Sequence, residues 1–127
     1  MNTYITPHFR WDELICPCCN RIAINDQLWK HMQALEVLRE QVDFRIMVTS
    51  GYRCPEHNAN VGGSVGSQHM VFATDVRPKD RKDLRLFNAR LGMIRIRANV
   101  LGFIGIGVYS TWVHLDMRKG DNVRWTG

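Results

Sequence analysis

Residues 50–77, SGYRCPEHNANVGGSVGSQHMVFATDVR, set the strongest limit on how this chain folds, because they hold a histidine and an aspartate of metal-ligand type close together behind a glycine-rich approach. These are His69 and Asp75, and a third such side chain, His114, follows much later. Neutral imidazole nitrogens and a carboxylate oxygen suit a borderline cation such as Zn²⁺. Three protein ligands leave a fourth coordination position open to water, as in catalytic rather than structural sites. We therefore expect the fold to bring these three residues together around one metal ion.

The alternation of residues around the ligands predicts strands. In WVHLDMR, Trp112, His114 and Asp116 share one side of a strand, and the apolar residues between them share the other. Asp75 lies inside the apolar run VFATDVR, where a partly buried carboxylate needs a cation or several hydrogen-bond donors. One side of these strands is expected to be core and the other to carry chemistry.

Simpler interpretations of the same residues remain open. Asp75 has two arginines close in sequence, Arg53 and Arg77, and an ion pair with either one satisfies a carboxylate. His114 is then a hydrogen-bonded histidine of the core. The pattern SxH before Asp75 favours the metal site over this combination.

Four motifs together resemble the M15 group of zinc D-Ala-D-Ala carboxypeptidases and related peptidoglycan endopeptidases, in particular its short phage and prophage members. The motifs are SGYRCPEHN, SQH, ATDVRP and WVHLDMR, and the opening HFRWDELICPCCN is also similar. The resemblance covers nearly the whole chain and implies a Hedgehog/D-Ala-D-Ala-peptidase-like fold. It implies that His69, Asp75 and His114 bind zinc, that Arg53 faces a carboxylate or carbonyl of the peptide, and that Ser67 supports the ligand loop.

The chain departs from the pattern of this group at two places. The usual sequence SxHxxGxAxD has one more residue, and a glycine, between the histidine and the aspartate than SQHMVFATD does. Many members also have an acidic residue three positions before the last ligand, or a histidine two before it. Here those positions are Thr111 and Trp112.

The implied reaction is metal-assisted amide hydrolysis. As general base we predict Asp116, which shares a strand side with His114. Asp116 has an alternative role, orienting the imidazole of His114 through its N–H group, and Glu56 is the reserve candidate for the base. Trp112 is predicted to contact substrate if it forms a wall of the substrate groove. It would block the site if its ring filled the fourth coordination position, which water is expected to occupy.

The four cysteines, Cys16, Cys18, Cys19 and Cys54, occur in a chain without a secretion signal, which favours thiols over a disulfide framework. Cys16 and Cys19 form a CxxC pair, and Cys54 forms a CxxH pair with His57. A second, structural zinc site of Cys₃His type is therefore geometrically conceivable. Cys54 and His57 also lie inside the substrate-side motif, and small buried thiols are the interpretation that we favour.

The formal charge of +5 favours anionic partners, which include cell-wall polymers and nucleic acid. Much of it lies in residues 81–97, on a helical pattern whose opposite side is apolar, so a solvated basic face explains it. The apolar positions are Leu84, Phe87, Leu91, Ile94 and Ala98. No zinc finger, helix-turn-helix pattern or aromatic RNA platform accompanies the charge, and nucleic acid is not an expected partner.

The length of 127 residues is that of one domain, and we assign residues 1–127 to a single M15-like peptidase domain. Strands and helices alternate without βαβ regularity, so the expected class is α+β, with a mostly antiparallel sheet flanked by helices. Helices are expected from near Gln27, from Pro55, and from Asp80 to near Gly102. Strands are expected over residues 44–49, 71–77, 103–108 and 112–117, with a last one over 123–125.

Three functional classes follow. The first is a zinc-dependent peptidase that cuts peptidoglycan stems or cross-bridges, as a phage or prophage lysin. The second is a catalytically weak or inactive zinc-containing wall-binding or virion component, which the shortened ligand spacing and Thr111 keep open. The third, a nucleic-acid-binding zinc protein, rests only on charge and on the CxxC pair.

The N-terminal sequence has neither the charged start, the apolar run nor the cleavage site of a signal peptide, and no apolar run is long enough to span a bilayer. We expect synthesis in the cytoplasm, no membrane insertion, and action on the cell wall after delivery by lysis machinery or a virion. A monomer is expected.

Overall fold

The centre of the fold is a five-stranded sheet with the strand order β3-β4-β6-β5-β7. The structure is a computed structural model that describes residues 3–127, so Met1 and Asn2 of the predicted domain lie outside the described residues. Neighbouring strands are antiparallel except β5 and β7, which are parallel. The strands are β3 Ile46–Ser50, β4 Ala73–Pro78, β5 Gly105–Val108, β6 Val113–Asp116 and β7 Val123–Thr126. A separate small sheet pairs β1 Tyr4–Thr6 with β2 Phe9–Arg10.

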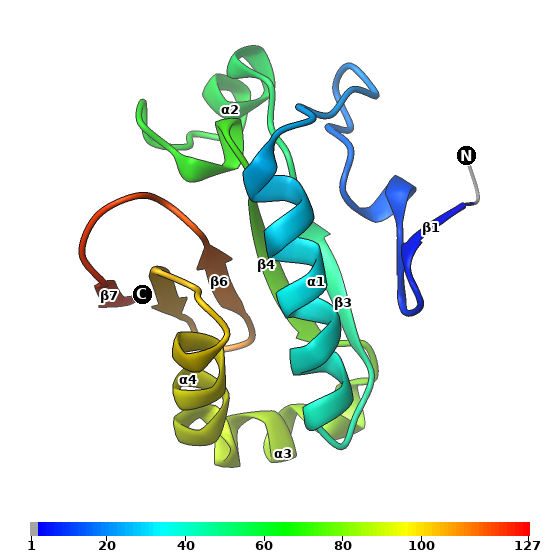
Figure 1. The fold of residues 1–127 in the computed structure, drawn as a ribbon, viewed down its shortest axis with the longest axis vertical. Helices are drawn as coiled ribbons and strands as arrows, with labels where there is room; N and C mark the ends of the chain where they lie inside the picture. The colour runs from blue at the N-terminus through cyan, green and yellow to red at the C-terminus, as the bar shows by residue number, and fades with distance from the viewer. Residues whose placement is uncertain (1–2) are drawn as a thin grey trace.

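Helices flank this sheet, which confirms the predicted α+β class. In Figure 1, α1 runs alongside β3 and β4, α2 lies near one end of these strands, and α3 and α4 lie near the other. None of the helices in residues 3–127 is long and apolar enough to cross a membrane. The helices are α1 Asp26–Gln41, α2 Pro55–Asn60, α3 Leu84–Ala89 and α4 Leu91–Val100, with 3₁₀ turns η1 Trp11–Glu13, η2 Gln68–Met70 and η3 Arg81–Asp83.

The longest helix, α1, begins at Asp26, next to the start expected near Gln27. The side chain of Asn25 accepts a hydrogen bond from the N–H of Leu28 at 2.9 Å, which satisfies one of the free amides of the first turn. The apolar stripe of the helix is buried in the core and consists of Leu28, Met32, Leu35 and Leu38. Burial of that stripe against the sheet stabilises the helix far more than its intrinsic propensity does.

The single long helix expected from Asp80 to near Gly102 is wrong. A 3₁₀ turn comes first, and the helix then breaks at Arg90, whose φ of −104° and ψ of 8° end α3 and precede α4. Figure 1 shows that the two helices run in different directions. The break lets Phe87 of α3 and Ile94 of α4 both reach the core, so tertiary packing overrides a helical pattern that continues through the sequence.

The two faces of β4 and β6 differ, as the alternation of the sequence predicts. Thr74 and Leu115 are fully buried in the core, and they are partners in the β4–β6 register. The next partners along, Asp75 and His114, point to the opposite face, because successive side chains of a strand alternate. The core and the candidate site therefore share the same two strands.

The glycine-containing strand predicted over residues 103–108 is β5, and its glycines are required by side chains that cross it. A Cβ atom on Gly105 would meet the carboxylate of Asp116, and one on Gly107 would meet the ring of Trp125, in each case well inside van der Waals contact. Asp116 and Trp125 come from the strands on either side of β5. β5 thus leaves space for both side chains to reach the site.

Candidate metal centre

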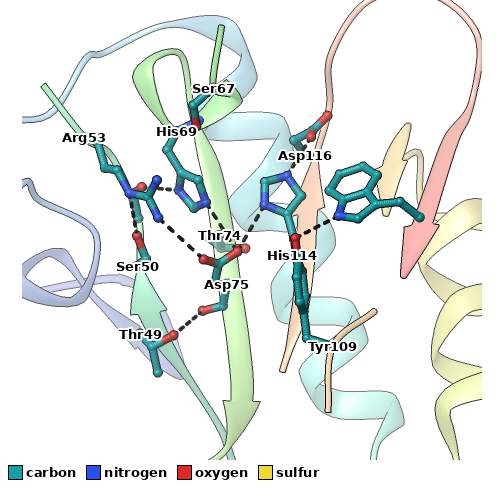
Figure 2. Close-up of polar contacts among 12 residues, drawn as sticks. Thr49, Ser50, Arg53, Ser67, His69, Thr74, Asp75, Tyr109, His114 and Asp116 are labelled. Atoms are coloured by element: carbon teal, nitrogen blue, oxygen red, sulfur yellow. Dashed lines mark hydrogen bonds and ion pairs between the residues drawn. The ribbon is translucent and has the colours of Figure 1, made fainter. Parts of the chain in front are cut away.

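Strand pairing brings two of the predicted ligands together. Asp75 of β4 and His114 of β6 are direct partners in the antiparallel register, and His114 Nδ1 lies 3.1 Å from Asp75 Oδ1. His69 comes from η2, just before β4, and its Nε2 lies 3.3 Å from the same oxygen. Figure 2 shows both imidazoles directed at this carboxylate. One ligand atom from each residue lies within 4.8 Å of the other two.

His69 is oriented through its other ring nitrogen. Nδ1 lies 2.7 Å from the carbonyl oxygen of Gly51, and since a carbonyl only accepts, Nδ1 carries the proton and donates. The backbone N–H of His69 donates to Ser67 Oγ at 3.2 Å, and the supporting role of Ser67 stays a prediction. Gly51 itself packs tightly, because a Cβ there would lie 2.6 Å from the carbonyl oxygen of Leu14. Nε2 of His69 is therefore left to face Asp75.

His114 is oriented in the same way, by Asp116. His114 Nε2 donates to Asp116 Oδ2 at 2.8 Å, and Asp116 is completely buried. Arg118 donates to both oxygens of that carboxylate, from Nε at 2.9 Å and from Nη2 at 2.7 Å. Burial acts to raise the pKa of Asp116, but the hydrogen bonds from His114 and Arg118 outweigh it and hold this pKa well below its usual range.

The electrostatics of the other two groups follow from the same contacts. Burial acts to lower the pKa of His114, and the hydrogen bonds with Asp116 and Asp75 outweigh this and raise it. Burial likewise acts to raise the pKa of Asp75, and the hydrogen bonds with His114 and His69 hold it well below the normal value. Asp75 is thus an ionised carboxylate on the cavity side of β4.

These residues fit a metal ion, and the proton count shows why. For both imidazoles to donate to Asp75, each would need protons on both ring nitrogens, because the second nitrogen already donates to Gly51 or Asp116. Two buried imidazolium ions around one carboxylate carry a large desolvation cost. A divalent cation removes that requirement, since two neutral imidazoles and a carboxylate then present lone pairs to it.

Arg53 faces the centre from the loop between β3 and α2. Its Nε donates to Ser50 Oγ and its Nη1 to Asn58 Oδ1, both at 3.3 Å. Its Nη2 lies 3.9 Å from Asp75 Oδ2, a longer contact than either imidazole makes. The other arginine considered for Asp75, Arg77, donates instead to the carbonyl oxygen of Pro78. An arginine ion pair is therefore a minor part of the surroundings of Asp75.

A cavity of about 410 Å³ opens over the three ligands. Arg53, Ser67 and Trp112, the predicted substrate residues, all line it. The ring of Trp112 stacks on that of Tyr109, with centroids 4.3 Å apart and planes within 6°. Trp112 thus forms a wall of the cavity together with Tyr109.

Two predicted candidates for the general base have different surroundings. Glu56 is exposed on α2 and is absent from the residues that line the cavity. Asp116 is adjacent to the centre, but both of its oxygens are engaged by His114 and Arg118. These are the contacts of the alternative role, in which Asp116 orients His114, while its role as base stays a prediction.

Sequence reasoning missed three residues of the site. Arg118 had a signal, because it continues the alternation of residues 112, 114 and 116 by one more step. Trp125 and Tyr109 had none. Trp125 Nε1 donates to Tyr109 Oη at 2.9 Å, and this contact exists only because β7 adds to the sheet in parallel beside β5.

The cysteines come together elsewhere in the molecule. One Sγ atom from each of Cys16, Cys19 and Cys54 lies within 4.8 Å of the other two, and all the cysteines are free thiols. The ring of His57 is not part of this group. Its backbone N–H donates to Cys54 Sγ at 3.4 Å.

Comparisons with known proteins agree with this geometry. The family model described as Peptidase M15 matches residues 7–116, which include all three predicted ligands, Arg53 and Asp116. The comparisons with curated proteins and with solved structures gave no match. A match over this much of the chain establishes the family and supports a metallopeptidase activity: the chain belongs to the peptidase M15 family.

Proposed function

We propose that this protein is a zinc-dependent peptidase that hydrolyses peptide bonds of peptidoglycan, in the stem or the cross-bridge. The observation that carries the proposal is the convergence of His69, Asp75 and His114 at the cavity, with each imidazole held through its other nitrogen. Zinc bound there would supply Lewis acidity, polarising the scissile carbonyl and acidifying water. The family supports peptidase chemistry, and the motif resemblance supports the wall substrate and a role as phage or prophage lysin delivered by lysis machinery or a virion.

The protein's own residues orient the ligands. The carbonyl oxygen of Gly51 accepts a hydrogen bond from His69 Nδ1, and Asp116 Oδ2 accepts one from His114 Nε2. Each bond selects one tautomer and one ring orientation, so that the free nitrogen faces the metal position. Arg118 holds Asp116 in turn, and we assign Asp116 and Arg118 as positioning residues.

Arg53 is proposed to bind the substrate. Its guanidinium is held by Ser50 and Asn58 at the wall of the cavity, and it remains only 18% exposed. A planar guanidinium fixed in this way is suited to a bidentate contact with a carboxylate, such as the D-alanyl end of a stem peptide. Trp112 and Tyr109 provide a flat stacked surface against which the peptide would lie.

A second candidate function is favoured by one observation. Within the described residues, the only carboxylate that lines the cavity is Asp75, which is proposed as a ligand. A site without a separate base fits a catalytically weak or inactive zinc-containing component of a virion or a wall-binding protein. In that case binding of wall peptides would persist without turnover.

Mass spectrometry of fragments released from purified peptidoglycan separates these candidates. The zinc-loaded protein is compared with chelator-treated protein, with chelated protein after zinc re-addition, and with the His114→Ala variant. Release of defined peptides that a chelator stops and zinc restores is the result expected for the peptidase. Wall binding without release, from several wall types and with zinc bound, would replace the peptidase by the binding component.

A further inference from the structure

A second group of side chains that could hold a metal ion lies apart from His69, Asp75 and His114, which together are called the M15 centre below. Cys16 and Cys19 belong to the loop after η1, and Cys54 immediately precedes α2. Cys16 Sγ and Cys54 Sγ are 3.6 Å apart, Cys16 is fully buried, and the other two are half-buried. The three thiols come from segments 35 or more residues apart. A disulfide joins only two sulfurs and would leave the third without a partner.

The backbone around the cluster is arranged to donate to sulfur. The N–H of Cys54 donates to Cys16 Sγ, and the N–H of His57 donates to Cys54 Sγ, both at 3.4 Å. Asn20, directly after Cys19, has a φ of 56°, the left-handed conformation that closes a tight turn. Within that turn, the N–H of Cys16 donates to Arg21 O at 2.8 Å and the N–H of Asn20 donates to Cys16 O at 2.7 Å. Several amides directed at sulfur favour thiolate over thiol, because a neutral thiol is a weak acceptor.

The electrostatics differ between the thiols, and only Cys16 is shifted toward the thiolate. Burial acts to raise the pKa of Cys16, but the backbone N–H groups of Cys54, Cys18 and Cys19 outweigh it and lower that pKa to about 7. Burial raises the pKa of Cys19, and its contacts with Cys16 and Cys54 add to this effect. Close thiolates repel one another, and a bound cation is what allows them to coexist.

We propose that Cys16, Cys19 and Cys54 bind a second Zn²⁺ ion, at a structural site separate from the M15 centre. Three cysteine sulfurs within 4.8 Å of one another, two of them in a CxxC turn, match the ligand type and spacing of structural zinc sites. His57, considered from the sequence as the fourth ligand, serves the site through its backbone N–H. A fourth ligand would come from water or from Cys18, whose thiol interacts with that of Cys54 but lies outside the group of three.

This second zinc would attach the N-terminal loop to the segment that holds Gly51, which orients His69, and Arg53, which is proposed to bind substrate. Leu14 O accepts from the N–H of Tyr52 at 2.8 Å, and the N–H of Arg53 donates to His69 O at 2.8 Å. Gly51, which orients His69, packs against Leu14. Residues 51–53, which lead directly to Cys54, therefore contact Leu14 just before the cysteine loop and His69 of the M15 centre.

Metal counting on reciprocal variants of the full chain tests the proposal. Protein purified without oxidants and loaded with zinc is expected to hold two zinc ions by elemental analysis, Cys19→Ser one, His114→Ala one, and the double variant none. Cobalt substituted into His114→Ala should give the near-ultraviolet thiolate-to-cobalt charge-transfer band, and cobalt in Cys19→Ser should not. Circular dichroism checks that each variant is folded.

Metal counts separate this proposal from the proposed function, because they do not depend on activity. One zinc in the parent chain that Cys19→Ser retains and His114→Ala loses would overturn the second site and leave the first intact. A Cys16–Cys54 disulfide in the protein as purified would overturn it as well. If Cys19→Ser fails to fold, the cobalt spectrum of His114→Ala decides alone, since absence of the thiolate band there excludes the site.

Discussion

Asp75 Oδ1 and His114 Nδ1 lie 3.1 Å apart because the two residues are direct partners across β4 and β6. The register of an antiparallel pair therefore brings together two of the three proposed ligands, without help from a loop. The shortened spacing between His69 and Asp75 leaves this pair untouched. It changes only the turn that delivers His69, which η2 still places within 3.3 Å of the same carboxylate.

Replacing His114 with alanine is predicted to remove zinc from the M15 centre, because a carboxylate and one imidazole bind zinc far more weakly than three ligands do. Equilibrium dialysis followed by elemental analysis measures the loss. His8→Ala is the control, since His8 bonds Glu36 far from the centre. Zinc retained at the M15 centre of His114→Ala would rule out this ligand.

Asp116→Asn distinguishes a positioning residue from a general base. An amide is uncharged and presents an N–H₂ group to either His114 or Arg118, so the orientation of His114 is weakened. We expect zinc affinity to fall about 10- to 100-fold, with most turnover restored at saturating zinc. Competition with a chelating dye gives the affinity, and peptide release gives the turnover. Unchanged zinc affinity with no turnover would instead support the base.

Arg53→Ala is predicted to raise KM about 10- to 100-fold with zinc content unchanged, because a charge-assisted hydrogen bond to substrate contributes about 1.5–3 kcal/mol. Arg53→Lys should recover only part of this, since an ammonium group lacks the planar fork. Kinetics on a defined stem peptide measure both variants. An unchanged KM in Arg53→Ala would dismiss the proposed contact.

His31 should make the metal-free protein less stable as pH falls. Burial lowers the pKa of His31 to about 3, against about 6.5 in the unfolded chain. Below pH 6.5 the unfolded chain binds a proton that the folded protein does not. The free energy of unfolding therefore decreases by up to roughly 1.4 kcal/mol per pH unit between pH 6.5 and about 3.

Denaturant unfolding of chelated protein over this range, compared with His31→Gln, isolates the effect of His31. The raised pKa of His114 acts in the opposite direction: its contribution is complete below pH 6.5 and is lost as pH rises through the folded value. That contribution is present in both proteins, so the difference between them contains the effect of His31 and its electrostatic interaction with His114. Equal pH slopes for the two proteins would show that His31 does not stay neutral in the folded state.

Gly105→Ala is predicted to destabilise the protein by about 1–3 kcal/mol and to weaken zinc binding, because the added methyl group displaces the Asp116 carboxylate. Gly107→Ala should destabilise similarly by displacing Trp125, with zinc affinity closer to that of the parent. Gly66→Ala is the control, since nothing lies within 4 Å of its added Cβ. Thermal unfolding and zinc titration give the two quantities, and a stable Gly105→Ala with parental zinc affinity would contradict the prediction.

Much of the ligand geometry was predictable because it depends on short-range rules. Side chains alternate along a strand, so the parity of Trp112, His114 and Asp116 already separates a chemical face from an apolar one. The start and apolar stripe of α1 are equally local, as is the short helix that begins at Pro55. The prediction of one long helix over residues 80–102 was wrong, because a periodic pattern indicates which side of a helix is apolar but not whether the helix axis stays straight.

The sequence alone predicted which residues could be ligands and which faces of the strands carry them. Both predictions depend only on neighbours a few positions away in the chain. The contacts of Asp116 with Arg118, the parallel addition of β7 and the convergence of Cys16 with Cys54 were settled by three-dimensional packing. Cys16 and Cys54 are separated by 38 positions, and no local rule fixes how such segments approach. Their meeting depends on the free energy of the whole core, because the entropy lost in closing the chain is recovered only when the elements between them pack.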